Sequence, residues 1–420
     1  MSDIQKNNRP NVPNLRFPEF SGEWKKIRVS DLLEFFSTNS LSWDQLEYGG
    51  TDIFNLHYGL IHSGLSTQIS LKKSILPSVK SEYRPRNYTL CEDGDVAFAD
   101  ASEDTNEVGK VVEFVDCAGK EIVCGLHTIH GRDKLGKTVV GFKGYAFSSP
   151  AFHNQIRRIA QGTKIFSINT GNFEEIFIGV PQKEEQDKIS HLLSLLDQRI
   201  AIQNRIIEDL KKLRTTLNNR FHNSFGEGVV TCFEELGKSY SGLSGKGAED
   251  FEKGYPFITY TNVFNHSFIS DEDMGYVRIK AEEHQNHVEH GDLLLTLSSE
   301  TPEEVGIGAV YLGNRKPLYL NSFCIGIHIN RKDIVLPTYL PYLVESKMFR
   351  KFIFPLAQGS TRYNLQKSDF EKKKIVLPTL EAQISITRIL DSITSKLSLE
   401  QEILTKLLMS KNALLSKMFI

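Results

Sequence analysis

The chain has 420 residues, 40% hydrophobic and 24% charged, a composition typical of a soluble protein with two or more domains. Fifty basic against 52 acidic residues give a formal net charge of −2, which excludes a strong overall positive field, so DNA binding would depend on local patches or partner proteins. Five cysteines without a CxxC pair predict reduced, mostly buried thiols, and the polar start and the lack of a long apolar run predict a cytoplasmic location.

One phrase occurs twice: AQGTKIFSI begins at residue 160 and AQGSTRYNL at residue 357. This offset of 197 holds without a gap to the end of the chain, whereas Asp31 matches Glu235 at an offset of 204, so the first copy carries seven extra residues. We predict two copies of one unit, each a globular domain with a helical tail. In chain order the expected segments are an N-terminal arm (1–22), a first domain (23–181), a long helix (182–222), a second domain (223–378) and a second long helix (379–420).

The first domain is predicted to be a mixed α/β structure. Runs of β-branched and aromatic residues predict strands at GDVAFAD, KVVEFV and EIVCGLHTI, and a helix is expected at AFHNQIRRI, just before the AQG phrase. The stretch LKKSILPSVKSEYRPRNY combines basic side chains with tyrosines, a pattern that suits phosphate and base contacts, although a solvated charged loop is the alternative. Its candidate DNA-binding residues are Lys72, Lys73, Lys80, Arg84, Arg86 and Tyr88.

The segment GRDKLGKT (Gly131–Thr138) fits the P-loop pattern G-x-x-x-x-G-K-[ST]. A P-loop lies between a strand and a helix, and the following VVGFKGYAF, rich in glycine and β-branched residues, argues against a helix. We therefore interpret the segment as a basic hairpin loop, in which Arg132, Lys134 and Lys137 are candidate DNA-phosphate contacts. A nucleotide-binding protein using this loop remains the alternative.

Cys117, Cys124, His127 and His130 could be read as a zinc site. Their spacing is unlike that of common zinc modules, and in an extended strand His127 and His130 would point to opposite faces, so no metal site is predicted. The acid-rich stretch from Glu92 to Asp104 lacks EF-hand spacing and is interpreted as a solvated turn and strand edge.

The first tail has an apolar residue at positions spaced alternately four and three apart, a heptad seam typical of a coiled coil. The helix is expected just after Pro181, with acids in its first turn. Two seam positions are polar, Gln203 and Arg214, and the second tail is polar at the matching Glu400 and Lys411. The apolar seam residues, our candidates for helix pairing and partner binding, are Ile189, Leu193, Leu196, Ile200, Ile207, Leu210 and Leu217 in the first tail and Ile386, Leu390, Ile393, Leu397, Leu404, Leu407 and Leu414 in the second.

The second domain repeats the character of the first. Strands are predicted at YPFITYTNV, GDLLLTL, GIGAVYL and FCIGIHI, and a helix at SKMFRKFIF. The candidate DNA contacts in this domain are Lys246, Arg315, Lys316 and Arg362. The Gly-Ser/Thr of the AQG phrase would either bring backbone amides to a phosphate or only form a turn.

The two tails are expected to pair, and separate packing of each tail on its own globular domain is the alternative. The second domain leaves the first helix and enters the second, and a domain with a radius of gyration of about 15 Å cannot readily place its ends a helix length of about 50 Å apart. Antiparallel pairing removes this conflict. The predicted fold is therefore α+β, with two similar mixed α/β domains separated by an antiparallel coiled coil of two long helices and related by a pseudo-two-fold axis.

Two variable domains, each followed by a long helix that begins P-x-x-E-x-Q, together with RFPEFSGEW, NSLSW, GLHTI, SGLSGK and AQGSTRYNL, resemble the specificity subunit of a type I restriction-modification system. The resemblance covers the chain from about Leu15 to Ile420. It implies two target-recognition domains, each reading one half of a bipartite, asymmetric DNA site, and a helix pair that sets the spacing.

The same resemblance implies that this chain is not an enzyme and has no catalytic residues. Two adenine-N6 methyltransferase subunits and motor/endonuclease subunits would be its partners on double-stranded DNA. S-adenosylmethionine, ATP and magnesium would be bound by those partners rather than by this chain. Consistent with this, the sequence contains no Asn/Asp-Pro-Pro-aromatic motif and no F-x-G-x-G. A protein-only adaptor with two similar binding domains is a further alternative.

Overall fold

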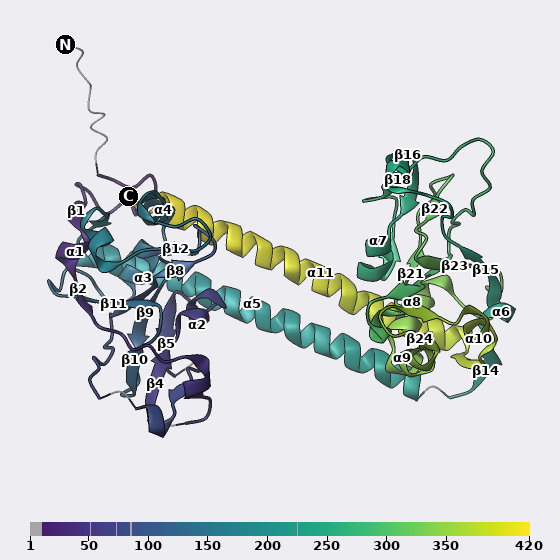
Figure 1. Ribbon diagram of the computed structural model, residues 1–420, viewed down its shortest axis with the longest axis horizontal. Helices are drawn as coiled ribbons and strands as arrows, with labels where there is room; N and C mark the ends of the chain where they lie inside the picture. The colour runs from purple at the N-terminus through teal and green to yellow at the C-terminus, as the bar shows by residue number, and fades with distance from the viewer. Residues whose placement is uncertain (1–10, 51, 73, 85, 225) are drawn as a thin grey trace, which may run out of the picture. The chain divides into compact units, whose positions relative to one another are not determined.

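The computed structural model describes residues 11–420 except 51, 73, 85 and 225, and the chain divides into two compact units (Figure 1). Unit 1 contains Met1–Asn204 and Glu402–Ile420, and unit 2 contains Arg205–Gln401. Lys73, one of the predicted DNA contacts, lies outside the described residues.

Unit 1 is built on a five-stranded sheet in the order β2-β11-β7-β9-β5. Its strands are β2 (Leu33–Phe36), β11 (Thr128–Asp133), β7 (Val96–Ala99), β9 (Val111–Asp116) and β5 (Gln68–Ser70). A second sheet contains β10 (Glu121–Cys124), β4 (Ile53–Leu56), β6 (Ser78–Val79) and β3 (Leu46–Glu47), and two-stranded pairs join β1 (Lys25–Arg28) to β13 (Phe177–Val180) and β8 (Ala101–Ser102) to β12 (Phe166–Ser167). The α-helices preceding its long helix are α1 (Val29–Leu32), α2 (Tyr58–His62), α3 (Phe142–Phe147) and α4 (Pro150–Ile159).

Unit 2 repeats this plan, with a five-stranded sheet in the order β15-β23-β19-β21-β17. Its strands are β15 (Gly237–Ser241), β23 (Cys324–Ile329), β19 (Leu293–Thr296), β21 (Gly308–Tyr311) and β17 (Phe268–Ile269). The smaller sheets contain β18 (Gly275–Val277), β16 (Phe251–Ile258) and β22 (Tyr319–Leu320); β14 (Gly228–Thr231) and β26 (Ile375–Pro378); and β20 (Ser298–Ser299), β25 (Tyr363–Leu365) and β24 (Ala357–Gln358). The shorter helices are α6 (Phe233–Leu236), α7 (Tyr260–Asn265), α8 (Leu340–Glu345), α9 (Lys347–Ile353) and α10 (Lys367–Lys372).

The strand registers confirm the internal repeat. In unit 1, His130 of β11 lies opposite Phe36 on one side and Ala97 on the other. In unit 2, Gly326 of β23 lies between Tyr240 and Leu294 in the same way. The two central sheets can therefore be superposed strand by strand, and residues can be compared by their place in the register.

The two long helices are α5 (Lys183–Asn223) and α11 (Leu380–Lys417), drawn teal and yellow in Figure 1. None of the eighteen seam positions named above, polar ones included, is exposed. Within unit 1, Lys411 near the end of α11 forms an ion pair of 2.6 Å with Asp197 in the first half of α5. Within unit 2, Arg214 in the second half of α5 donates to Thr394 of α11 at 3.1 Å. The start of each helix thus lies beside the end of the other, which confirms the antiparallel pairing.

The seam residues Arg214 and Lys411 have a structural reason to be basic. Lys411 lies over the ring of Tyr145 at 5.9 Å, and Arg214 lies over the ring of the matching Tyr342 at 5.6 Å. The hydroxyl of Tyr145 donates to Asp197 of the adjoining long helix. Each cation therefore fixes a long helix to the globular part of its unit through ring and acid contacts.

Both long helices begin with the same buried glutamine. The amide nitrogen of Gln186 donates to the carbonyls of Lys137 (3.0 Å) and Pro181 (2.8 Å), and its oxygen accepts from the Val139 amide at 2.9 Å. Gln383 makes the same three bonds at 2.8, 2.8 and 2.9 Å, to Ile334, Pro378 and Leu336. These three hydrogen bonds, formed at the start of each long helix, explain why the P-x-x-E-x-Q pattern has a glutamine.

The arm residues after position 10 bind the start of α5. Arg16 forms two hydrogen bonds of 2.7 Å with the carboxylate of the buried Glu185, and the indole of Trp24 donates to the same group at 3.3 Å. The Leu15 amide donates to the Lys417 carbonyl at 2.9 Å. Leu15 and the motif RFPEFSGEW that follows it therefore connect the beginning of α5 with the end of α11 inside unit 1.

Several local predictions were wrong. The predicted strand EIVCGLHTI is interrupted between Cys124 and Thr128, where β10 ends and β11 begins. The stretch from Glu92 to Asp104 is not a solvated strand edge, because it contains β7, a buried strand in the middle of the five-stranded sheet. The predicted strand YPFITYTNV is a strand only as far as Ile258, because the side chains of Thr259 and Asn262 cap the N-terminus of α7. A helix, α3, does follow GRDKLGKT, starting at Phe142 after Gly141 in a left-handed conformation. The five cysteines are all buried and free, as predicted. Among the described residues, no helix is long and apolar enough to cross a membrane.

Candidate nucleic-acid interface

A hollow of unit 1 lies where the AQG phrase meets the central sheet. It has a volume of about 540 Å³ and mixes aromatic, imidazole, hydroxyl and carboxylate side chains. The lining residues are Tyr58, His62, Ala101, Ser102, Glu103, Glu107, His127 and Ile165. They come from α2, from β8 and the loop after it, from the loop before β11 and from the turn after AQG. A sequence search for basic residues misses most of this set.

The AQG phrase supplies one rim of the hollow by means of a tight turn. Gly162 has φ +142°, and a Cβ there would stand 1.8 Å from the Ile165 carbonyl oxygen. Gly359 has φ +154°, and a Cβ would stand 2.0 Å from the Arg362 carbonyl oxygen. Only glycine fits such a backbone. The returning chain pairs with β8 in unit 1 and with β20 in unit 2, so the phrase is repeated because each unit uses the same turn.

The polar groups of the hollow are held in fixed positions. His62 lies between the Ala101 carbonyl (3.1 Å) and Glu107 (3.4 Å), and Lys110 pairs with Glu107 at 2.8 Å. Burial would raise the pKa of Glu107, but the contacts with Lys110 and His62 hold it below its usual value. Glu107 is therefore an ionised acceptor at neutral pH.

His127 points its ring into the hollow from a strained backbone. It is a non-glycine residue at φ 54°, and its ring contacts Asp100 at 3.1 Å and the edge of Tyr58 at 5.2 Å between centroids. His57 precedes Tyr58 in the chain, and its pKa is lowered mainly by burial and to a smaller extent by the charge of His127. A left-handed histidine costs free energy, which is often retained where a side chain must be presented in one direction.

Unit 2 presents a different set of side chains at the same place. α7 begins with Tyr260 as α2 begins with Tyr58, and Phe323 before β23 takes the place of His127 before β11. Arg362 stands at the position of Ile165. Its guanidinium lies over the exposed Phe323 ring at 4.7 Å and donates to Ser298 at 3.0 Å. The two units therefore carry counterpart surfaces with the same frame and different chemistry.

The predicted DNA contacts of the basic run do not line the hollow. Lys72 pairs with Asp116 at 2.9 Å, and Lys80 donates to the Asp44 carbonyl. Arg84 lies 3.6 Å from Glu121, and the hydroxyl of Tyr88 and then the charge of Glu121 raise its pKa. Arg86 is exposed, whereas Tyr88 packs against a small hydrophobic cluster. These residues stay predictions, and Lys72, Arg84 and Arg86 are the exposed cations described in this run.

Arg132 is used inside the protein. Its guanidinium makes two hydrogen bonds of 2.8 Å to the buried Asp95 and one of 2.7 Å to Glu92. Burial would raise the pKa of Asp95, but hydrogen bonds from Arg132 and His130 hold it below its usual value. The equivalent acid in unit 2, Asp292, accepts from Tyr240 and His328 instead, and burial raises its pKa despite these bonds.

The loop that fits the P-loop pattern is closed by its own carboxylate. Asp133 accepts hydrogen bonds from the amides of Leu135 (2.9 Å) and Thr138 (2.8 Å) and from the Thr138 hydroxyl. A P-loop would offer backbone amides of this kind to a phosphate and its Ser/Thr hydroxyl to magnesium. Lys134 donates to the Ser30 carbonyl at 3.0 Å and Lys137 is exposed.

In unit 2, the predicted contacts differ in how accessible they are. The ammonium of Lys246 is held by Glu283 and by the Arg278 carbonyl at 2.7 Å, and its side chain is only 3% exposed. Arg315 and Lys316 are exposed, and Lys316 lines a cavity of about 250 Å³. Arg362 is the predicted residue that the structure brings into the counterpart surface.

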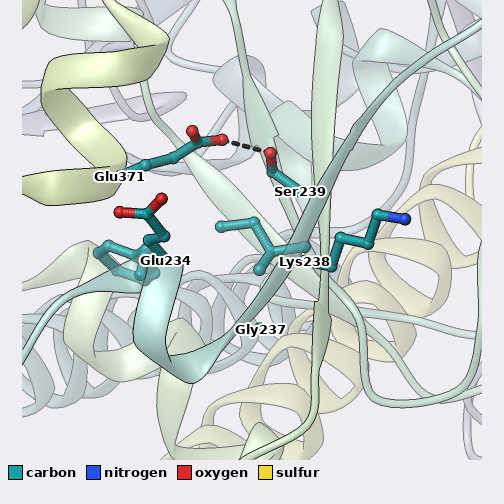
Figure 2. Close-up of a pocket in the computed structure, with 7 residues that line it drawn as sticks. Glu234, Gly237, Lys238, Ser239 and Glu371 are labelled. Atoms are coloured by element: carbon teal, nitrogen blue, oxygen red, sulfur yellow. Dashed lines mark hydrogen bonds between the residues drawn. The ribbon is translucent and has the colours of Figure 1, made fainter.

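Another cavity in unit 2, of about 310 Å³, is shown in Figure 2. It is lined by Glu234, Lys238 and Glu371 among others, and the Ser239 hydroxyl donates to Glu371. Figure 2 shows Lys238 pointing away from the Ser239–Glu371 pair. Two carboxylates with the nearest amine turned aside disfavour an anionic ligand, so this cavity is a poor phosphate site.

The long helices carry a second set of apolar side chains that the seam does not use. Leu195, Ile202 and Leu213 are exposed on α5. On α11 the exposed set is Ile384, Ile389, Leu399, Ile403, Leu408 and Met409. Ile202 and Leu399 occupy matching positions of the repeat, 52% and 57% exposed. We call this set the outer stripe. The heptad pattern of the sequence did not indicate the outer stripe, because that pattern describes the seam residues alone.

The profile of the type I restriction modification DNA specificity domain matches residues 21–212 and again residues 233–409. The chain belongs to this family. The prediction of a type I specificity subunit is confirmed by this match, and the nucleotide-binding alternative receives no support.

Among curated relatives, the type I restriction enzyme MjaVIII specificity subunit of Methanocaldococcus jannaschii is 25% identical over 267 residues. The alignment covers 58% of this chain and spans only 61% of the relative's length. The fold resembles the crystal structure of a type I restriction-modification S subunit from M. genitalium, with a TM-score of 0.54, 16% identity and coverage of 97% of this chain and 99% of that one. A chain from a structural study of complex assembly and conformational transition in a type I R-M system gives a TM-score of 0.59, 16% identity and coverage of 93% and 96%.

Proposed function

We propose that this specificity-domain protein reads a bipartite, asymmetric DNA site, one half with each unit. The observation that supports this most is the pair of counterpart surfaces, which share a glycine turn and a tyrosine-led helix but differ in the side chains presented. Identical frames would give each unit the same approach to the duplex. Different side chains would give the two half-sites different sequences.

The chemistry of each surface suits base edges in the major groove. In unit 1, the ionised Glu107 accepts hydrogen bonds and Ser102 both donates and accepts, which suits the exocyclic amino groups of cytosine or adenine. In unit 2, the guanidinium of Arg362 suits the O6 and N7 acceptors of guanine, with Phe323 keeping its plane fixed. Arg84, Arg86, Arg315 and Lys316 would contact phosphates and set the register.

Methyl transfer would be carried out by partner subunits. The outer stripe gives each unit exposed apolar side chains on its long helices, and a helix of a methyltransferase subunit packed against them would bury side chains such as Ile202 and Leu399. Because the stripe occurs once in each copy of the repeat, we propose two docked methyltransferases. S-adenosylmethionine, ATP and magnesium would then belong to the methyltransferase and motor/endonuclease subunits, and the assembly would act in the cytoplasm on chromosomal DNA.

A methylation assay with the reconstituted complex tests the half-site assignment. The modified motif is first determined by sequencing methylated DNA treated with the wild-type complex. Arg362→Ala should relax the base preference in one half of the motif, by about 1–3 kcal/mol for a lost bidentate contact, and leave the other half unchanged. His127→Ala should relax only the other half. Equal relaxation of both halves by either variant would contradict the assignment.

A further inference from the structure

Two cysteines and a histidine lie together in the interior of unit 1, outside the hollow. The sulfurs of Cys91 and Cys124 and a ring nitrogen of His130 all lie within 4.8 Å of one another. Their residues are 5%, 2% and 0% exposed. The sequence pattern considered above contained Cys117, Cys124, His127 and His130. It did not contain Cys91, which lies 33 residues before Cys124. His127 itself is exposed and contacts Asp100.

The spacing of the two sulfurs fits metal ligation. They are 3.5 Å apart. A disulfide requires about 2.05 Å, whereas two thiolates bound at about 2.3 Å to a tetrahedral zinc ion stand roughly 3.8 Å apart. The chain therefore already holds the two sulfurs near the edge length of a zinc tetrahedron.

One ring nitrogen of the histidine is free to bind a metal. Its Nε2 lies 2.8 Å from the Asp95 carboxylate, and its Nδ1 is buried and, among the described residues, has no hydrogen-bond partner. An unpaired buried nitrogen costs free energy, whereas a metal would use its lone pair. A carboxylate on the opposite nitrogen is the usual support of a ligating imidazole, because it fixes the tautomer that leaves the other nitrogen free.

The charges also balance. Two thiolates neutralise a divalent ion, a neutral imidazole adds no charge, and the Asp95 carboxylate is paired with Arg132 at 2.8 Å. A buried site with no net charge avoids the desolvation penalty that an isolated ion would carry. These three residues would supply three of the four ligands of a tetrahedral ion.

Unit 2 shows that the fold does not need these side chains. In its register Gly326 takes the place of His130, and Val288 takes that of Cys91, since the Val288 amide donates to Leu318 as the Cys91 amide does to Ile122. Asp292 there accepts from Tyr240, whose ring fills the space that a side chain at Gly326 would use. The cysteine-histidine group is therefore particular to unit 1.

We infer that Cys91, Cys124 and His130 form a zinc site in the core of unit 1. The ion would join the ends of β10 and β11 to the segment before β7 and so hold the loop between β10 and β11 that carries His127.

Elemental analysis of the full-length chain, produced with zinc and then dialysed against a chelator of moderate affinity, tests this inference. We expect about one zinc per chain in the wild type and a loss to near zero in Cys91→Ser and Cys124→Ser. Cys324→Ser is the matched control, because it removes an equally buried thiol from unit 2, and it should retain the ion. Circular dichroism of each variant reports whether it is folded.

A second measurement needs no variant. The wild type refolded with cobalt(II) in place of zinc should show the visible d–d absorption and the thiolate charge-transfer band of a tetrahedral site with sulfur ligands. Absence of both bands, retention of no zinc by the wild type, or equal zinc content in Cys91→Ser and Cys324→Ser would each overturn the inference. An intact mass lower by two hydrogens, showing a Cys91–Cys124 disulfide, would overturn it as well.

Discussion

Replacing the buried glutamine at the start of either long helix should weaken the attachment of that helix to its own unit. The attachment of the other helix in the other unit should not change. Gln186→Ala removes three hydrogen bonds of 2.8 to 3.0 Å from a side chain that is 0% exposed. At roughly 1 kcal/mol for each net hydrogen bond, the local loss is about 3 kcal/mol, or roughly a 150-fold change in the opening equilibrium. Gln383→Ala should cost the same in unit 2, because its three bonds have nearly the same lengths.

Hydrogen exchange of two backbone amides measures each effect separately. The Val139 amide donates to Gln186 and the Leu336 amide donates to Gln383. In Gln186→Ala the Val139 amide should exchange up to about 150-fold faster while Leu336 is unchanged, and Gln383→Ala should show the reverse. Each variant is thus the control for the other.

The conservative variant Gln186→Glu distinguishes hydrogen bonding from side-chain volume. Glutamate fills the same space and can accept from Val139, but its second oxygen would face the carbonyls of Lys137 and Pro181 with no proton to donate. We expect it to lose protection at Val139 at least as strongly as alanine does. If Val139 exchanged within about twofold of the wild-type rate in both variants, the account of how the long helix is attached would be wrong.

The remaining predictions concern the buried acids, the outer stripe and the basic run. Asp95→Asn should destabilise unit 1 by roughly 3–5 kcal/mol, because Arg132 loses its buried partner, whereas Asp292→Asn should cost about 1 kcal/mol or less, since burial raises the pKa of that acid. Because the pKa of Asp95 is lowered in the folded chain, its contribution is present above the unfolded value near 3.8 and disappears as the pH falls through the folded value, so acid unfolding followed by circular dichroism should lose this component in Asp95→Asn. Ile202→Asp should reduce the co-purified methyltransferase from two subunits per chain to one without changing the melting temperature, and Gln198→Asp, another exposed position on α5, should retain both. Arg84→Ala combined with Arg86→Ala should weaken DNA binding equally for cognate and unrelated sequences and reduce its salt dependence, and a loss confined to the cognate site would show base contacts instead.

The long helices could be predicted from the sequence because their information is local and periodic. A 3.5-residue repeat places one face of each helix against another, and none of the predicted seam positions is exposed. Even the polar exceptions were informative, since Arg214 and Lys411 fall at matching positions and meet matching tyrosines. The direction of pairing followed from the size of the domain between the helices.

The hollow could not be predicted in the same way. Its lining runs from Tyr58 to Ile165, and no short window of sequence contains more than a few of its members. The error at YPFITYTNV shows the same limit on a smaller scale, because the cap formed by Thr259 and Asn262 outweighs the strand propensity of the residues that follow. The one available signal was the repeated glycine of the AQG phrase.

Charge was the least reliable guide to the site. Arg132 and Lys246 were predicted to contact DNA, but their partners Asp95 and Glu283 lie 37 residues away in each case, and no sequence pattern links those segments. Basic residues in a mixed fold are as often ion-pair partners as ligand contacts. Arg362 differs because it lies over an exposed ring, with a hydroxyl as its hydrogen-bond partner.

The comparison of the two units separates what this fold must keep from what it can vary. The glycine turn, the helix-starting glutamine and the cation over a tyrosine occur in both, and each is fixed by a backbone or packing contact that a substitution would break. The residues at His127 and Phe323, and at Ile165 and Arg362, differ, although they occupy the same places in that frame. All four are exposed, so a change there costs little stability. A duplicated protein built in this way can alter what one unit recognises without disturbing the attachment of its helices.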